Sequence, residues 1–428
     1  MQRHTANTSI TMKTSDSEIS LIGPFSQAIP MTGLPKTGPI KDTQLQVLAN
    51  AGVLVQEGKI VKVDAYQKLE QGAQANAYQV DRIAQPMVLL PGLIDAHTHL
   101  CFAGSRANDY ALRVAGKSYL EIAHSGGGIL ETVRKTREAT LIELVDLLKK
   151  RCDRHLAEGV TTCEVKSGYG LTVDDELKML EAIALVHKHH ALDLIPTCLA
   201  AHTRPPEFTD SKLYLQHLLD VLLPQVQEQN LASRVDIFVE ESAFTEKESL
   251  DYLLKAKEMG FDITVHADQF STGGSRVAAE AGALSADHLE ASDEASVALL
   301  KEAGVVATVL PGASLGLGMG YAPARTMLDS GLCLTIATDW NPGSAPMGDL
   351  LTQAALLGAA EKLSTAETFA AITTRASRAL NLSDRGELGK GCLADIIAFP
   401  TADYREILYQ QGKLKPAIIW KKGVRVCL

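Results

Sequence analysis

The chain has 428 residues, of which 46% are hydrophobic and 21% are charged, a composition typical of a globular enzyme. Its formal net charge of -10 argues against a nucleic-acid partner or an anionic membrane surface, because both would need a basic face. The apolar stretches are strand-sized and interrupted by charged residues, so we expect no membrane-spanning segment.

The N-terminal region predicts one part of a small β-rich unit, to which we assign residues 1–86. Residues 1–45 carry little periodic signal, and we expect part of them to be irregular. The polar segment 1–20 lacks the apolar stretch of a secretory signal, which favours a cytoplasmic location. The segment Ala51–Val63 predicts a β-hairpin that turns at Glu57-Gly58.

Between residues 87 and 383, strand-like and helix-like segments alternate. The eight strand-like runs are Val88–Ile94, Thr161–Val165, Leu194–Ala200, Val235–Val239, Asp262–Val265, Leu284–Ala286, Val305–Leu310 and Cys333–Ala337. The amphipathic segments between them include Leu141–Ala157, Thr172–Lys188, Lys212–Gln227, Lys247–Met259 and Asp293–Glu302. Eight strands alternating with helices indicate a (β/α)8 TIM barrel, in which the chemistry lies at the C-terminal ends of the strands.

Residues 384–428 return to a β pattern. A strand is expected at Ala394–Phe399, and a final pair of strands at Ala417–Trp420 and Val424–Leu428. The simplest arrangement is one small β-sandwich-like domain assembled from both termini, with the barrel inserted between its two parts. The predicted fold class is therefore α/β.

Metal-binding residue types gather where the predicted barrel strands end. The segment Asp95-Ala96-His97-Thr98-His99 ends the first run, and because side chains alternate along a strand, His97 and His99 point to the same face. His266, His288 and Asp339 end three other runs. A single histidine at a strand end is more often structural, but this combination is typical of a metal site with imidazole and carboxylate ligands. A metal-dependent hydrolase is the leading hypothesis.

The other histidines and the cysteines carry weaker signals. His202 ends the third run at the barrel mouth, whereas tail, loop or helix-surface positions are expected for His4, His124, His155, His187, His189, His190 and His217. The seven cysteines are scattered singly without a C-x-x-C pair, which favours reduced thiols. Cys101, beside the histidine pair, is expected to be a buried or loop residue rather than a nucleophile.

Two glycine-rich segments flank the predicted mouth. Gly126–Gly128 lacks the Lys-Ser/Thr ending of a phosphate-binding loop, and we expect a flexible or tightly turned loop there. Pro311–Gly320, after the seventh run, is expected to shape the rim of the barrel.

Beyond the metal-site residues, longer blocks of sequence resemble the imidazolonepropionase family of the amidohydrolase superfamily. These blocks are Phe102-Ala103-Gly104-Ser105-Arg106, Gly126–Ile129, Glu164–Leu171, His266-Ala267-Asp268-Gln269, Ser285-Ala286-Asp287-His288-Leu289 and Ala337–Ser344. The resemblance covers roughly residues 87–381 and the segment Gly389–Asp395. It implies hydrolysis of the cyclic amide of 4-imidazolone-5-propanoate to N-formimidoyl-L-glutamate, a step in histidine degradation.

The same resemblance implies how the metal site works. The ion, zinc or iron, would be held by His97, His99, His266 and Asp339, and would activate a water molecule. Asp339 would also pass the water proton to the leaving nitrogen, and His288 would polarise the ring carbonyl. The fourth run ends in Val239-Glu240-Glu241-Ser242, without a lysine that could bridge two metals, so one metal is expected, and Glu240 or Glu241 is the remaining candidate for a further metal contact. Asp95 is expected to be structural or to support a ligand.

Residues resembling the family's substrate contacts lie in the same loops. Arg106 would clamp the propanoate carboxylate with two hydrogen bonds. The other expected substrate contacts are Tyr169, His202, Gln269, Asn341, Gly343 and Ser344. Gln269 stands where many members have a glutamate, and its neutral amide can hydrogen-bond a ring but cannot act as a base. For Lys166, a second anion contact and a structural ion pair are both open.

Two other classes of function would fit parts of this sequence. A related barrel deaminase, acting on cytosine or guanine, would use the same metal ligands but would not need Arg106 for a neutral base. A non-catalytic scaffold is disfavoured because all four ligand residues and His288 are present. The expected partner is a small anionic substrate, and since barrels of this family commonly pair, we expect a homodimer.

Overall fold

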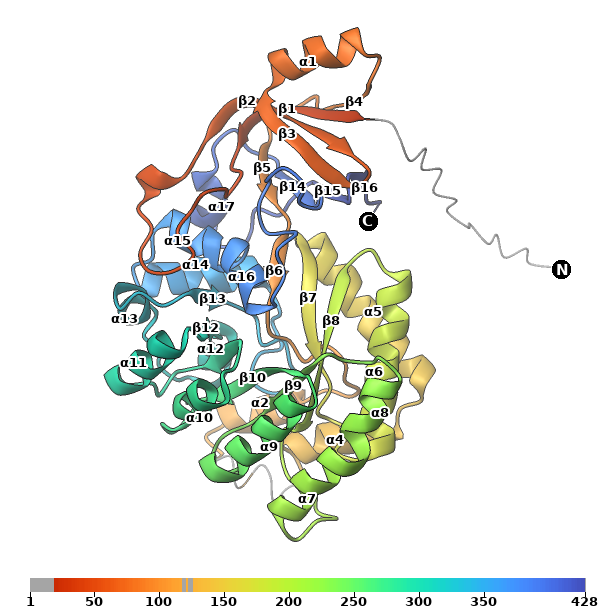
Figure 1. Cartoon of the computed structure of the whole chain (residues 1–428), viewed down its shortest axis with the longest axis vertical. Helices are drawn as coiled ribbons and strands as arrows, with labels where there is room; N and C mark the ends of the chain where they lie inside the picture. The colour runs from red at the N-terminus through yellow and green to blue at the C-terminus, as the bar shows by residue number, and fades with distance from the viewer. Residues whose placement is uncertain (1–18, 118–120, 122–125, 428) are drawn as a thin grey trace, which may run out of the picture.

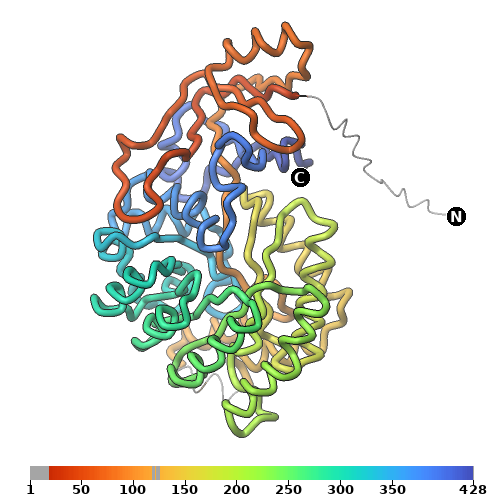
Figure 2. Tube along the Cα trace, viewed as in Figure 1, coloured from red at the N-terminus to blue at the C-terminus, as the bar shows by residue number. Residues whose placement is uncertain are grey.

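Two eight-stranded sheets organise the molecule. The computed structural model describes residues 19–117, 121 and 126–427. One sheet is parallel and is surrounded by helices, and the other is mixed and is built from the first and last parts of the chain. Figure 1 shows the mixed sheet, in red, orange and blue, above the yellow, green and teal barrel, and the Cα trace of Figure 2 shows the same arrangement. The predicted α/β barrel with a β unit from both termini is thereby confirmed.

The parallel sheet forms a nearly closed barrel. Its strands, in the order of both sequence and space, are β6 (Leu93–Asp95), β7 (Val160–Lys166), β8 (Asp193–Ala201), β9 (Arg234–Ile237), β10 (Asp262–Ala267), β11 (Ser285–His288), β12 (Val306–Val309) and β13 (Leu334–Ile336). Beyond the ends of β6 and β13, Asp339 N donates to His97 O and His99 N donates to Trp340 O, both at 3.0 Å. These two bonds join the first strand to the last.

Helices cover the outside of the barrel. They are α2 (Ala107–Val114), α4 (Ile129–Glu138), α5 (Leu141–Ala157), α6 (Val173–His189), α7 (Ser211–His217), α8 (Leu223–Glu228), α9 (Glu246–Glu258), α10 (Gly274–Ala281), α11 (Glu294–Ala303), α12 (Pro311–Leu317), α13 (Ala324–Asp329), α14 (Leu350–Ala360), α15 (Thr365–Ala371) and α16 (Thr374–Ala379). Capping boxes fix the starts of α5 and α9, where Thr140 and Thr245 pair with Glu143 and Glu248.

The helix expected over Lys212–Gln227 is not continuous. A π-helix, η2 (Leu218–Leu222), separates α7 from α8. Pro224, in the first turn of α8, has no N–H to continue the α-helical hydrogen bonds, which accounts for the wider local winding. Most of the glycine-rich rim segment Pro311–Gly320 forms α12.

The mixed sheet joins the two ends of the chain. Its elements are β1 (Ser20–Ala28), β2 (Leu48–Gln56), β3 (Lys59–Ala65), β4 (Gln79–Arg82), β5 (Val88–Pro91), β14 (Ile396–Phe399), β15 (Ile418–Lys421) and β16 (Val424–Arg425), with α1 (Tyr66–Ala75), α17 (Arg405–Tyr409) and the short 3-10 helix η1 (Asp42–Gln44) beside it. Glu57 and Gly58, both with positive φ, make the β2–β3 turn, as the sequence predicts. Strand β1 was not expected, because Gly23-Pro24 interrupts its strand pattern.

The run Val88–Ile94 is two strands rather than one. Its first half is β5, which pairs with β1 and β14 of the mixed sheet, and its second half is β6 of the barrel. Gly92 lies between them, and a Cβ there would be 2.1 Å from Thr161 Oγ1. A glycine is therefore required where the chain passes from one sheet to the other.

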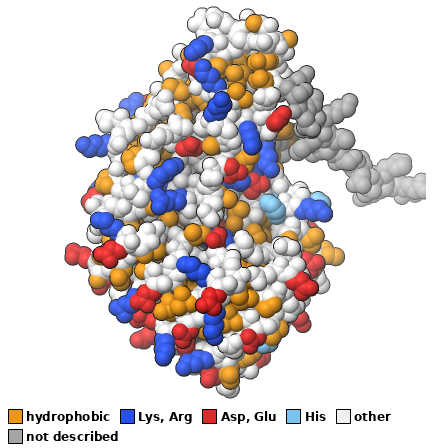
Figure 3. All heavy atoms as spheres, in the orientation of Figure 1, with side chains coloured by type: hydrophobic (Ala, Val, Ile, Leu, Met, Phe, Trp, Pro, Cys, Tyr) orange, Lys and Arg blue, Asp and Glu red, His pale blue; other side chains and the backbone are white. Residues whose placement is uncertain are grey.

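The surface carries both signs of charge. On the face drawn in Figure 3, acidic and basic side chains are interspersed among uncharged ones. Within the described part of the chain, no helix is both long enough and apolar enough to cross a bilayer.

Candidate metal centre and active site

Four side chains with ligand atoms meet at the C-terminal end of the barrel. His97 Nε2 and His99 Nε2 lie 3.6 and 3.4 Å from Asp339 Oδ1, and His266 Nε2 lies 3.3 Å from His99 Nε2. A tetrahedral ion with bonds of about 2.0–2.2 Å would separate its ligands by about 3.3–3.6 Å. His97 Nε2 has no hydrogen-bond partner among the described residues. His97, His99 and Asp339 form one group of side chains whose possible ligand atoms lie within 4.8 Å of one another, and His97, His266 and His288 form another. The donor types, these groups and the unpartnered nitrogen fit a bound metal ion.

Carboxylates behind two of these histidines fix the orientation of the rings. His97 Nδ1 donates to Asp287 Oδ2 at 2.6 Å, and His266 Nδ1 lies 2.9 Å from Asp236 Oδ2. A carboxylate on Nδ1 favours the tautomer in which Nε2 carries the free electron pair. In both residues Nε2 therefore faces the site as a potential ligand.

Burial favours the neutral form of His97 and His99. It lowers the pKa of His97 and of His99, and nearby imidazoles and the Lys166 ammonium act in the same direction. Burial also raises the pKa of Asp339 to about 7, while His288 and Asn341 oppose this change. A cation at the site would favour the ionised form of Asp339.

Lys166 is enclosed by carboxylates inside the barrel. Its side chain is 1% exposed, and its Nζ lies 2.7 Å from Glu164 Oε1, 2.9 Å from Asp236 Oδ2 and 3.9 Å from Asp287 Oδ2. Burial alone would lower the pKa of Lys166, but Asp236, Glu164 and Asp287 hold it above its ordinary value. Of the two interpretations left open for this residue, the structure shows the ion pair.

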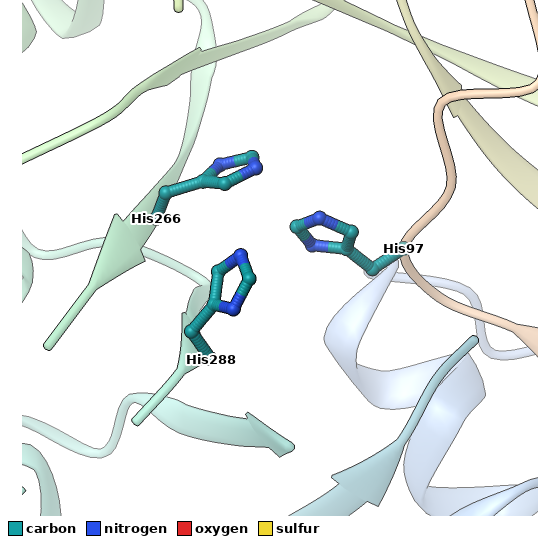
Figure 4. Close-up of side chains that lie close together, drawn as sticks. All are labelled: His97, His266 and His288. Atoms are coloured by element: carbon teal, nitrogen blue, oxygen red, sulfur yellow. The ribbon is translucent and has the colours of Figure 1, made fainter. Parts of the chain in front are cut away.

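His288 ends β11 and points toward the metal-ligand cluster. Figure 4 shows the rings of His97, His266 and His288 directed toward one another. The centroid of the His288 ring lies 5.3 Å from that of His266 and 5.8 Å from that of His97. On its other side, His288 Nδ1 lies 3.5 Å from Glu290 Oε2. Its Nε2 edge is thus available to a group bound in the cluster.

The segment after β13 holds the Asp339 carboxylate. Asn341 Nδ2 donates to Asp339 Oδ2 at 2.8 Å, and Ser344 Oγ donates to the same oxygen at 3.3 Å. Asn341 Oδ1 in turn accepts from the backbone N–H of Gly343 and of Ser344. Sequence reasoning expected substrate contacts here, and the structure shows that Asn341 and Ser344 contact a metal-ligand candidate directly.

Arg106 lies beside this segment. A Cβ on Gly343 would be 2.6 Å from Arg106 Nη1, so the absence of a side chain there makes room for the guanidinium. Arg106 Nε donates to Asp109 Oδ2 at 2.8 Å, and Asp109 also accepts from Gly128 N at 2.9 Å. Gly128, which immediately precedes α4, has a φ of 81°, a conformation that favours glycine.

Tyr169 and His202 lie on the His99 side of the cluster. Tyr169 is 4% exposed, and its ring centroid lies 5.9 Å from that of His99. Burial raises the pKa of Tyr169, and the nearby guanidinium of Arg106 opposes the shift. The ring of His202 stacks on His99 at 5.1 Å, and its Nδ1 donates to Gly168 O at 3.1 Å. Both side chains therefore lie next to the proposed metal ligands.

Gln269 is buried in the loop that follows β10. The next two residues bind a carboxylate: Phe270 N and Ser271 N donate to Glu240 Oε1 at 2.8 and 3.0 Å. Ser271 Oγ donates to Glu240 Oε2. Glu240, considered in the sequence as a further metal contact, instead holds the Gln269 loop.

Asp95 and His155 form a buried pair beneath the site. Asp95 Oδ2 accepts from His155 Nε2 at 2.9 Å and from Thr338 Oγ1 at 2.6 Å, which agrees with the structural role expected for Asp95. The surface position expected for His155 is wrong, because the residue is fully buried. His155 shares the buried face of α5 with Leu148 and Cys152, at helical spacing, and this periodicity in the sequence could have predicted its burial.

The other histidines and Cys101 take less central positions. His187 and His189 are exposed, His190 and His217 are half-buried, and His4 and His124 lie outside the described residues. Cys101 is buried, and burial raises the pKa of its thiol to about 12. The expectation that Cys101 is not a nucleophile agrees with this environment.

Known proteins resemble this chain in sequence and in fold. The Amidohydrolase family model matches residues 123–417. Imidazolonepropionase from Bdellovibrio bacteriovorus is 40% identical over 389 residues, which cover 90% of this chain and 91% of that protein. Imidazolonepropionase from Bacillus cereus is 41% identical over 383 residues, covering 89% of each chain.

Solved structures with lower sequence identity share the fold. An adenosine deaminase from Xanthomonas campestris with bound zinc has a TM-score of 0.68 and 19% identity, and the match covers 95% of this chain and 92% of that chain. Ochratoxinase from A. niger has a TM-score of 0.68 and 16% identity, with 96% of both chains covered. At such identities the likeness concerns the architecture alone.

Proposed function

Because the chain belongs to the imidazolonepropionase family of amidohydrolases, we propose that it hydrolyses 4-imidazolone-5-propanoate to N-formimidoyl-L-glutamate, a reaction of histidine degradation. The observation that carries this proposal is the 40% identity to an imidazolonepropionase across 90% of the chain. The reaction opens a five-membered ring by breaking its amide C–N bond, and the oxygen of water enters the new carboxylate.

The proposed metal ligands are His97, His99, His266 and Asp339. Three neutral imidazoles and one carboxylate suit both zinc and iron, so we propose one ion of either kind. When bound, such an ion would polarise the ring carbonyl and lower the pKa of a water molecule. The buried His97 Nε2, without a partner among the described groups, supports this assignment.

Asp339 and His288 are the proposed proton-handling residues. Asp339 Oδ2 is fixed by Asn341 at 2.8 Å, which orients the carboxylate to take a proton from the attacking water and give it to the leaving ring nitrogen. His288 would donate a hydrogen bond to the carbonyl oxygen as negative charge develops there. Both groups are buried, and exclusion of water strengthens such interactions.

The propanoate group of the substrate needs a cation at a distance from the metal ligands. Arg106 suits this role because Asp109 holds its Nε, which leaves the two terminal nitrogens for a carboxylate. We propose that Tyr169 and His202 contact the carboxylate and the ring, that Gln269 contacts a ring nitrogen, and that Asn341, Gly343 and Ser344 line the same pocket. For the assembly we propose a homodimer, which light scattering would show as twice the chain mass.

Turnover of freshly prepared 4-imidazolone-5-propanoate tests the proposal, with guanine and cytosine assayed in parallel. We expect ring opening of the imidazolone alone. In Arg106→Ala, KM for the imidazolone should rise by about 10- to 100-fold, because a charge-assisted hydrogen-bonded pair is lost. Deamination of guanine or cytosine with no ring opening would contradict the proposal and favour a deaminase.

A further inference from the structure

The mechanism proposed above gives no role to a cationic side chain inside the barrel, yet Lys166 lies there completely buried. A buried ammonium is costly unless it is paired and hydrogen-bonded. Lys166 is the last residue of β7, and its side chain extends toward β9 and β11, where Asp236 and Asp287 lie. Its position demands an explanation that the proposed reaction steps do not provide.

Each of the three carboxylates around Lys166 also contacts either a proposed metal ligand or the backbone next to one. Asp236 Oδ2 lies 2.9 Å from Lys166 Nζ and also 2.9 Å from His266 Nδ1. Asp287 Oδ2 lies 3.9 Å from Nζ and accepts from His97 Nδ1 at 2.6 Å. The same two oxygens thus contact the ammonium on one side and an imidazole on the other.

The third carboxylate supports the strand end that carries both His97 and His99. Glu164 Oε1 accepts from Lys166 Nζ at 2.7 Å, and its Oε2 accepts from Thr98 N at 3.1 Å. Thr98 lies between the two histidines in sequence, and its Oγ1 donates to Glu164 O at 2.6 Å. Lys166 is therefore connected to His266 and to His97 through one carboxylate each, and to the backbone between His97 and His99 through Glu164.

Electrostatics explains why a cation is needed at this point. Asp236 and Asp287 are both fully buried and approach the same ammonium, so without it they would repel each other at low dielectric. A lysine can approach several oxygens at once because its ammonium is compact and has three donors. An anionic substrate would be repelled by the surrounding carboxylates, which argues against a direct substrate contact for Lys166.

We propose that Lys166 is a positioning residue for the metal centre. Through Asp236, Asp287 and Glu164 it holds the rings of His266 and His97 and the His97–His99 segment with their Nε2 atoms directed into the site. This inference rests on the metal assignment made under the proposed function. Loss of the ammonium should weaken metal binding while the barrel remains folded.

Metal affinity of the purified full chain is the direct test. Zinc affinity is measured by competition with a chromophoric chelator, and the ligand geometry by the visible spectrum of the cobalt form. For Lys166→Met we expect a 10- to 100-fold loss of zinc affinity, about the effect of removing a group that orients metal ligands, and a changed cobalt spectrum. Lys166→Arg, which keeps the charge, should recover part of the affinity. Wild-type affinity and an unchanged spectrum in Lys166→Met would overturn the proposal.

Lys178→Met is the matched control, because Lys178 pairs with Asp175 at 2.8 Å on the outer helix α6 and does not contact the cluster. It should bind zinc like the wild type. If Lys166→Met does not fold, Glu164→Gln decides: a several-fold loss of affinity supports the proposal and unchanged affinity contradicts it. Failure of the metal assignment would look different, since wild type and His97→Ala would then bind zinc equally.

Discussion

The two oxygens of Asp339 have different neighbours. Oδ1 lies 3.4 Å from His99 Nε2 and 3.6 Å from His97 Nε2, whereas Oδ2 accepts from Asn341 Nδ2 at 2.8 Å. One oxygen is thus placed to bind an ion, and the other is held at a fixed angle by the loop after β13. A carboxylate held in this way can exchange a proton with water without reorienting.

Asp339→Asn keeps the shape of the side chain but removes its capacity to take a proton. We expect an intact far-UV spectrum and a kcat lower by about 10²- to 10⁴-fold, the usual range for loss of a general base. Steady-state kinetics on zinc-saturated protein measures the effect. A kcat equal to that of the wild type would show that Asp339 takes no part in the proton transfers.

Asp109 is predicted to act through Arg106. Because it accepts from Arg106 Nε and from Gly128 N, Asp109→Ala should free the guanidinium and raise KM by about 10-fold, with a smaller effect on kcat. Asp153→Ala, which removes an exposed partner of Lys149 on α5, is the control and should leave both constants unchanged. An unchanged KM in Asp109→Ala would show that Arg106 keeps its position without this carboxylate.

At the scale of elements, the passage from β5 to β6 depends on close packing. A Cβ at Gly92 would meet Thr161 Oγ1 at 2.1 Å and Thr161 Cγ2 at 2.4 Å. We expect Gly92→Ala to lower the free energy of unfolding by about 1–3 kcal/mol through overpacking. Thr161→Ala in the same chain should recover part of that loss, as urea denaturation would show. Additive losses in the double variant would mean that the two residues do not clash.

An ion-pair cluster joins the barrel to the mixed sheet. Asp193, which begins β8, lies 2.7 Å from Lys421 Nζ of β15 and 2.7 Å from Arg385 Nη1. Burial opposes ionisation of Asp193, but these two cations hold the pKa of its carboxyl below the ordinary value of 3.8. Because the pKa is lower in the folded chain, this contribution to stability is complete above the unfolded pKa and is lost as pH falls through the folded one.

Asp193→Asn should therefore be less stable than the wild type at neutral pH, by about 1–3 kcal/mol, and the difference should shrink as pH falls below about 4. Urea denaturation at several pH values measures both quantities. A difference that stays constant down to pH 2 would contradict the assigned ionisation.

At the scale of the whole molecule, the barrel could be predicted because each strand is a short apolar run between amphipathic helices. The metal-ligand candidates were visible for the same reason, since they end those runs. The contacts of Asp236 and Glu164 with the metal-ligand segments could not be predicted. Both residues lie within strands, and their partners depend on which strands are adjacent. The division of Val88–Ile94 between two sheets also escaped prediction, since hydrophobic periodicity does not identify the partner strand.

Metal binding should stabilise the whole chain. Only the folded barrel brings the four proposed ligands together, so a metal ion at 100 times its dissociation constant would add about 2.7 kcal/mol. Removal of metal by a chelator should lower the calorimetric Tm, and zinc or ferrous iron should restore it. In His97→Ala the Tm should not respond to either treatment. A Tm of the wild type that is insensitive to chelation would contradict a structural contribution from the metal.

A single turnover in H2-18O tests most directly whether water attacks the ring carbonyl at a metal centre. The product is fragmented by mass spectrometry to locate the label. We predict one 18O atom in the newly formed carboxylate of N-formimidoyl-L-glutamate, and no product after removal of the metal. Label in a formyl group would place the attack at the carbon between the two nitrogens. Product formation by metal-free protein would show that the reaction does not need the metal. Either result would contradict attack of water on the ring carbonyl at a metal centre.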